Sequence, residues 1–156
     1  MSADEQFETK LAILADILTK KRGALLSVLA ISENQESLYA SEPSPERRDF
    51  LMQMGQEKQV HIDDVLACDD VFQGIFDSIA GIFEEKGKVY AEQVKALQAS
   101  IAEVLELDIK IRAQEEKTKI AAQAAWGQRP NQSEAPPAAR ANLLEQYKNN
   151  NRNRPR

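Results

Sequence analysis

The chain of 156 residues has a single cysteine, Cys68, and a single histidine, His61. One cysteine excludes a disulfide within the chain, and the two residues together are too few for a zinc site. We therefore predict no metal and no cofactor. A lone thiol is typical of a reducing compartment, and the acidic start, Met1 to Glu5, lacks the basic and apolar stretches of a signal peptide. We expect a cytoplasmic protein.

Long apolar runs and aromatic residues are also scarce. No stretch approaches the roughly 20 apolar residues of a membrane-spanning helix, so we expect no membrane insertion. Aromatic residues make up 6% of a chain that is 42% hydrophobic, so leucine, isoleucine, valine and alanine must supply most of the core. A small aliphatic core of this kind suits helices packed side by side.

The net charge of -5 is unevenly divided along the chain. Residues 127–156 carry a net charge of +4, which leaves -9 on residues 1–126. Because an acidic body repels phosphate groups, we do not expect a nucleic-acid-binding protein. A regulator that uses its basic tail on an anionic surface ranks last among the functions considered.

Residue patterns typical of catalysis are missing as well. The sequence has no glycine-rich phosphate loop and no nucleophile elbow. His61 and Cys68 stand seven residues apart, which separates them by about 10 Å along a helix, beyond hydrogen-bond reach. We predict a surface or boundary histidine and a cysteine that packs, with an intermolecular redox role as the alternative for Cys68. We do not expect an enzyme, and we predict no catalytic residue.

Proline is absent from residue 46 to residue 129, which favours long unbroken helices. The first helix is predicted from about residue 3 to residue 32, after a capping box formed by Ser2 and Glu5. Residues 33–44 lose the helical period and are predicted to form a loop. The apolar side chains of the first helix recur with a 4-3-4 spacing, and Lys21 fills one position of this stripe: Phe7, Leu11, Leu14, Leu18, Leu25 and Val28.

Two more helices are predicted after this loop. Ser44 is expected to cap a second helix that starts at Pro45, and its apolar face continues to Phe83. Gly87 is the best candidate for a break, and the alternative is a helix that continues through it. The third helix is predicted over residues 88–124, with Leu105 and Ile109 beside its stripe. That stripe includes two acidic residues, Asp108 and Glu115, among its apolar and small members: Val94, Leu97, Ile101, Val104, Ile111 and Thr118.

These patterns predict an all-α protein. We expect residues 1–126 to form an elongated antiparallel bundle of three long amphipathic helices. Residues 127–138 form a proline-containing linker. Residues 139–156 hold a short amphipathic segment, with Leu143, Leu144 and Tyr147 on its apolar side, and a basic tail that we expect to be disordered.

One set of residues between Glu57 and Lys119 carries a family resemblance. Its members are Glu57, Lys58, Gln59, Ile62, Asp63, Asp70, Phe72, Tyr90, Leu97, Gln98, Ile101, the stretch Leu107 to Ile111, and Glu115. With these residues, the run resembles the flagellar export chaperones of the FlgN and FliT type. Tyr147, Lys148 and Asn149, after the linker, are similar to the tail of that family, whereas the first helix matches in pattern only.

The resemblance implies a small cytoplasmic helical chaperone of type III (flagellar) export. Proteins of that family hold late substrates, the hook-associated proteins or the filament cap, in an export-competent state and deliver them to the export apparatus. They grip an amphipathic segment of the substrate with their C-terminal helical region. In this chain that role falls on the end of the third helix and on the trio beyond the linker: Asp108, Ile111, Glu115, Trp126, Leu143, Leu144 and Tyr147.

Several alternatives stay open at this point. Asp108 and Glu115 either pair with basic or polar residues of the partner or face water. Trp126 either packs at the end of the bundle or contacts the partner. The trio beyond the linker either docks on the bundle or binds the partner as a small helix. The alternative function is a structural coiled-coil or adaptor protein that acts by helix-helix association, including a homodimer.

Overall fold

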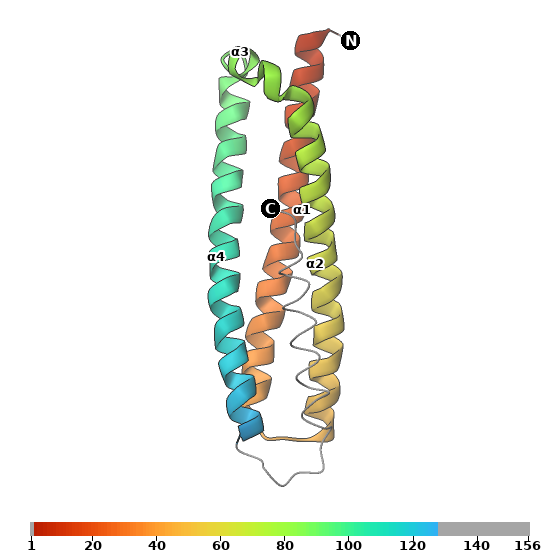
Figure 1. Ribbon diagram of the computed structural model, residues 1–156, viewed down its shortest axis with the longest axis vertical. Coiled ribbons are helices and arrows are strands. Elements are labelled where there is room, and N and C mark those ends of the chain that lie inside the picture. Colours follow the sequence, from red (N-terminus) through yellow and green to blue (C-terminus); the bar gives the residue numbers. More distant parts are fainter. Residues whose placement is uncertain (1, 128–156) are drawn as a thin grey trace. The chain divides into compact units, whose positions relative to one another are not determined.

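The computed structural model describes residues 2–127, so Leu143, Leu144, Tyr147 and the rest of residues 128–156 lie outside the described residues. Three long helices dominate it (Figure 1). The described elements are α1 (Ala3–Ala40), α2 (Pro45–Ile79), the 3-10 helix η1 (Ala80–Ile82), the short α3 (Phe83–Gly87) and α4 (Ala91–Gly127). Residues 2–127 contain no strand, and the predictions of an all-α class and of three long helices are confirmed.

The chain divides into two compact units, and each long helix contributes a segment to both. Unit 1 consists of residues 1–26 and 62–110. Unit 2, in its described part, consists of residues 27–61 and 111–127. Each unit is therefore a small three-helix assembly with a core of its own.

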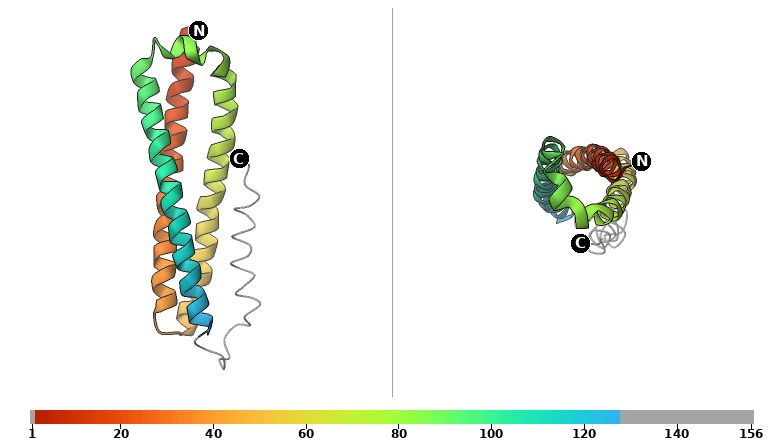
Figure 2. Two further views of the ribbon diagram at one scale, coloured as in Figure 1. Left: turned by 60° about the vertical axis from the view of Figure 1, so that its left-hand side comes forward. Right: turned by 90° about the horizontal axis from the view of Figure 1, so that it is seen from above.

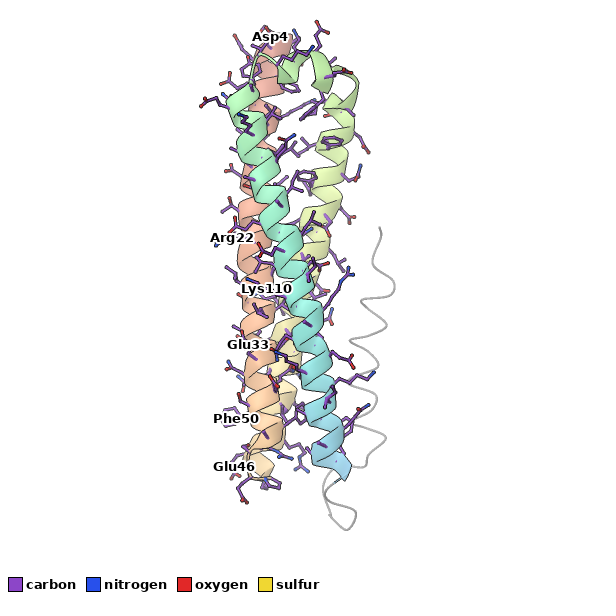
Figure 3. The ribbon with its side chains drawn as sticks, turned by 90° about the vertical axis from the view of Figure 1, so that its left-hand side faces the viewer. Asp4, Arg22, Glu33, Glu46, Phe50 and Lys110 are labelled. Carbon is purple, nitrogen blue, oxygen red and sulfur yellow. The ribbon has the colours of Figure 1, made fainter. Side chains whose placement is uncertain are left out.

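In unit 1, α1 packs against both other long helices. Lys21 forms an ion pair with Asp69 of α2. Arg22, which is labelled on α1 in Figure 3, donates from Nε to Glu103 Oε1 of α4 over 2.5 Å. α1 and α4 run in the same direction and α2 runs opposite to both, so consecutive long helices are antiparallel, as predicted (Figure 1). The buried members of the predicted α1 stripe that line this core are Phe7, Leu11, Leu14, Leu18 and Leu25.

Aromatic rings close one end of unit 1, where η1 and α3 lead from α2 into α4 (Figure 2). Phe7 is fully buried, with its ring centroid 5.7 Å from that of Phe83 and 5.8 Å from that of Tyr90. Phe83 also contacts Phe76, at a centroid separation of 5.7 Å. The prediction that the second helix continues to Phe83 is wrong: α2 ends at Ile79, and the tighter turn of η1 brings Phe83 over Phe7.

The first helix is longer than predicted, because α1 continues to Ala40 through residues 33–40 that were expected to form a loop. Ser32 and Gln35 occupy its buried side in unit 2. Their spacing keeps the helical period, but both residues are polar. The hydrophobic pattern therefore ends before the helix ends. The true connection to α2 is the short segment from Ser41 to Ser44.

The predicted starts of the first two long helices are confirmed by hydrogen bonds, whereas the third, predicted from residue 88, begins at Ala91. The amide of Glu5 donates to Ser2 Oγ over 3.2 Å, and the amide of Arg47 donates to Ser44 Oγ over 3.0 Å. The buried Arg47 side chain also donates to the carbonyl oxygens of Tyr39 (3.4 Å) and Ser41 (2.9 Å). One arginine thus satisfies a carbonyl at the end of α1, that of Tyr39, and a carbonyl just beyond the helix, that of Ser41.

The predicted break at Gly87 is confirmed, since α3 ends there and α4 begins at Ala91. Gly87 does not form the left-handed glycine cap on which the prediction was based, because no residue within 2–127 has a positive φ. Gly55 and Gly74 lie inside α2, and a Cβ atom added at either would meet no atom within 4 Å. Neither position is fixed as glycine by backbone conformation or by close packing.

Replacing Ser44 by alanine should lower the free energy of unfolding by about 1 kcal/mol, because the amide of Arg47 loses its acceptor. Urea denaturation followed by circular dichroism would measure the change. Ser37→Ala is the matched control, since the Ser37 hydroxyl is exposed and only donates back to the carbonyl of Glu33 in its own helix. Equal effects of the two substitutions would show that Ser44 is not acting as a cap.

Candidate partner-binding surfaces

The interior of unit 2 is crossed by a cluster of polar side chains from all three long helices. Lys58 Nζ of α2 lies 2.8 Å from Glu115 Oε1 of α4, and the Ser32 hydroxyl of α1 donates to the same oxygen. The hydroxyl of Thr118 donates to the carbonyl of Ser32 over 2.9 Å. We call Ser32, Lys58, Gln114, Glu115 and Thr118 the polar cluster.

Gln114 extends the polar cluster toward the edge of unit 2. Its amide nitrogen lies 2.9 Å from Glu36 Oε1 of α1 and 3.3 Å from the hydroxyl oxygen of Thr118. No buried side-chain nitrogen or oxygen within residues 2–127 lacks a hydrogen-bond partner. The polar cluster is therefore a complete network rather than a set of orphaned groups.

Lys58 is the most deeply buried charge in the polar cluster, with a side chain that is 5% exposed against 19% for Glu115. Burial lowers the pKa of Lys58 from its ordinary value of 10.5, although the charge and hydrogen bond of Glu115 act in the opposite direction. Desolvation thus outweighs attraction at this ammonium group. The ion pair is formed, but it contributes little net free energy to the folded state, because desolvation offsets the attraction.

The predicted site residues on α4 are divided between the two units. Asp108 is half-buried in unit 1, whereas Ile111 and Glu115 belong to unit 2, where Ile111 is part of the core. Glu115 is 19% exposed and is paired within the chain, because Lys58 and Ser32 both bind it. Its pairing with residues of a partner stays a prediction.

Trp126, the last predicted site residue within the described part of the chain, packs against the end of α1. Its ring centroid lies 6.3 Å from that of Tyr39, with the two rings nearly perpendicular at 88°. Both residues are half-buried. This edge-to-face contact accounts for packing at the end of unit 2 and leaves part of the indole accessible.

Lys58 and Ser32 were not predicted to belong to any site. The available signal was their register: Lys58 stands four residues before Ile62 and seven before Val65, both buried, and Ser32 stands four after the buried Val28. A polar residue in such a position lies on the inner side of its helix. The spacing alone could have marked both residues as buried.

A different feature marks α4 within unit 1. Leu105 is 60% exposed and Ile109 is 68% exposed, so both lie on the outer side of the helix. The sequence had predicted them beside the buried stripe. With Ala102, also exposed, they have the i, i+3, i+7 spacing of a single helix face. We call Ala102, Leu105 and Ile109 the α4 ridge. Glu106, exposed, lies next to it in sequence.

The remaining reactive groups do not gather into a site. Cys68 is half-buried, and its pKa is raised by burial and by the neighbouring charges of Asp69 and Asp64, which disfavours the thiolate. His61 is likewise half-buried. Across residues 2–127, no three His, Cys, Asp or Glu side chains are grouped so that they could hold a metal ion.

Comparison of the chain with protein-family models, with curated proteins and with solved structures finds no match. None of the described helices is long and apolar enough to cross a membrane. The resemblance to flagellar export chaperones therefore stays a prediction from the sequence.

Proposed function

We propose that this protein is a cytoplasmic export chaperone of the FlgN and FliT type. It binds a late flagellar substrate, a hook-associated or filament cap protein, and keeps that substrate competent for export. It acts by association of helices and performs no chemical reaction. The observation that carries the proposal is the α4 ridge, where Leu105 and Ile109 are more than half exposed on one helix face.

The α4 ridge supports a binding role because exposed aliphatic side chains grouped on one helix face are typical of helix-in-groove and helix-to-helix recognition. Among their neighbours on α4, Ala102 is small and Glu106 is acidic, whereas Lys110 and Arg112 add positive charge beside Ile109. A partner helix can therefore approach closely at Ala102 and meet charges of both signs at the edge of the contact.

The charge of the chain indicates what kind of partner helix fits. Residues 1–126 carry a net charge of -9, so an amphipathic helix flanked by lysine or arginine would be attracted to this surface. Such a helix would self-associate if left free, which is the property that makes an export substrate need a chaperone. The proposed partner is thus an apolar helix face with basic edges.

The double variant Leu105→Gln with Ile109→Gln should weaken capture of the partner at least tenfold. Each side chain buried in a contact contributes about 1.5 kcal/mol or more, and about 1.4 kcal/mol is a tenfold change in affinity. Co-expression with hook-associated and cap proteins, followed by titration of the captured one, would measure the loss. Glutamine keeps helix propensity, so the helix content should not change.

Val71→Gln is the matched control for this experiment, because Val71 is a 52% exposed aliphatic residue on α2 of the same unit. It should leave affinity within about twofold of the wild type. Failure of the wild-type chain to capture any of these substrates would contradict the proposed function. A wild-type dimer that the double variant converts to a monomer would instead favour the structural adaptor.

A further inference from the structure

The two units have different interiors. All thirteen buried side chains of the described part of unit 1 are apolar. In unit 2, ten described side chains are buried, and six of them are polar. The buried side chains of unit 2 are Val28, Ile111, Ala122 and Ala125 on the apolar side, with Ser32, Gln35, Arg47, Lys58, Gln114 and Thr118 on the polar side.

This difference determines how much each unit resists opening. Apolar side chains lose their stabilisation when water reaches them, and the loss grows with the apolar area exposed. Buried hydrogen-bonding groups exchange protein partners for water, so most of their interaction is recovered in the open form. Two of the four apolar members of the unit 2 core are alanines, which bury little area.

The ion pair in unit 2 follows the same logic. Lys58 and Glu115 are both freed from desolvation when unit 2 opens, and this gain offsets the loss of their mutual attraction. The lowered pKa of Lys58 agrees, because it reports that the closed form disfavours the ammonium charge. The polar cluster aligns the three helices by specific bonds while adding little resistance to their separation.

We propose that unit 2 is a locally opening segment, in which residues 111–127 of α4 separate from Ser32 and Lys58 while unit 1 remains folded. The polar cluster restores the correct register on closing, because Glu115 has partners on both other helices. Opening uncovers the inner face of α4 that carries Ile111, Glu115 and Ala122. This conformational device does not depend on the identity of any partner.

Hydrogen exchange of the full chain, read by mass spectrometry, tests the proposal directly. Peptides from residues 28–40, 51–60 and 112–126 should show protection at least about tenfold lower than peptides from residues 7–25, 62–78 and 94–107. Their exchange should also depend only weakly on urea, because a local opening exposes little surface. Equal protection in the two units would overturn the proposal.

The double variant Lys58→Met with Glu115→Leu makes the unit 2 core more apolar and provides the second test. Protection in unit 2 should rise by about tenfold, with no change in unit 1. The matched control is Lys21→Met with Asp69→Leu, which removes a cross-helix ion pair of unit 1 and should leave unit 2 unchanged. Unaltered protection of unit 2 in the first variant would refute a role for the polar cluster.

Gln114→Leu covers the case in which that double variant does not fold. It adds an apolar side chain to the same core. Glu36, half-buried at the edge, can be rehydrated, and Thr118 loses the Gln114 donor but keeps its own hydrogen bond to the carbonyl of Ser32. Protection in unit 2 should again increase. None of these hydrogen-exchange measurements needs a partner. A negative result would contradict local opening without contradicting the chaperone function, and a negative capture experiment would contradict the chaperone function without contradicting local opening.

Discussion

Glu115→Leu should lower the free energy of unfolding of unit 2 by about 3 kcal/mol. The substitution leaves the Lys58 ammonium group buried beside an apolar side chain, without the carboxylate that lies 2.8 Å away in the wild type. Breaking a buried ion pair from one side typically costs about 3–5 kcal/mol, and the partial exposure of Glu115 places this case at the lower end.

The double variant Lys58→Met with Glu115→Leu should recover the whole of that loss and exceed the stability of the wild type, because no charge remains buried. Trp126 is the only tryptophan and belongs to unit 2, so its fluorescence during urea unfolding reports on this unit. The two single variants complete a double-mutant cycle. If Glu115→Leu unfolds at the same urea concentration as the wild type, Glu115 does not stabilise the buried ammonium group of Lys58.

The deficit of Glu115→Leu should shrink as the pH rises. Burial already holds the pKa of Lys58 below the value of 10.5 expected in the unfolded chain, and removal of Glu115 takes away the group that raises it. Between the folded and unfolded pKa values the unfolded state binds more protons, so stability increases with pH across that interval. Stability of the double apolar variant should lack this dependence.

Phe7→Ala should cost about 3–5 kcal/mol in unit 1, the typical range for removing a fully buried aromatic ring. The substitution removes contacts with Phe83 and Tyr90 together, and it leaves a cavity at the place where η1 and α3 turn the chain into α4. We expect the midpoint of urea unfolding, followed by circular dichroism, to fall sharply.

Phe50→Ala provides the comparison, because Phe50 is 55% exposed on α2 and should change stability by less than about 0.5 kcal/mol. The two variants delete the same atoms, so the difference between them measures burial at Phe7 rather than the chemistry of phenylalanine. Similar midpoints for both would mean that the aromatic end of unit 1 is not part of the folded core.

Much of the fold could be predicted from the sequence because it is encoded locally. Ser2 and Ser44 stand at the correct spacing before their helices, and the 4-3-4 stripe of α1 identifies its buried side as far as Val28. Capping and amphipathic spacing depend on neighbours a few residues away, which a single sequence displays.

The end of α1 and the pairing of Glu115 could not be predicted in the same way. Hydrophobic patterning cannot identify a helical segment whose buried side is polar, and the buried side of α1 is polar at Ser32 and Gln35. The partner of Glu115 is Lys58, 57 residues away, and only the packing of α2 against α4 determines that they meet. Glu115 in the stripe therefore suggested an external partner, whereas unit 2 supplies Lys58 as a partner within the chain.

The two glycines inside α2 bear on how the chain has been shaped by selection. At Gly55 and Gly74 neither the backbone conformation nor any neighbouring atom excludes a methyl group. Glycine has a lower helix propensity than alanine, so an alanine at either position would stabilise the helix. Natural proteins that need only to exceed a threshold of stability accumulate such positions. The sequence thus retains simple substitutions through which an evolving or engineered descendant could become more rigid.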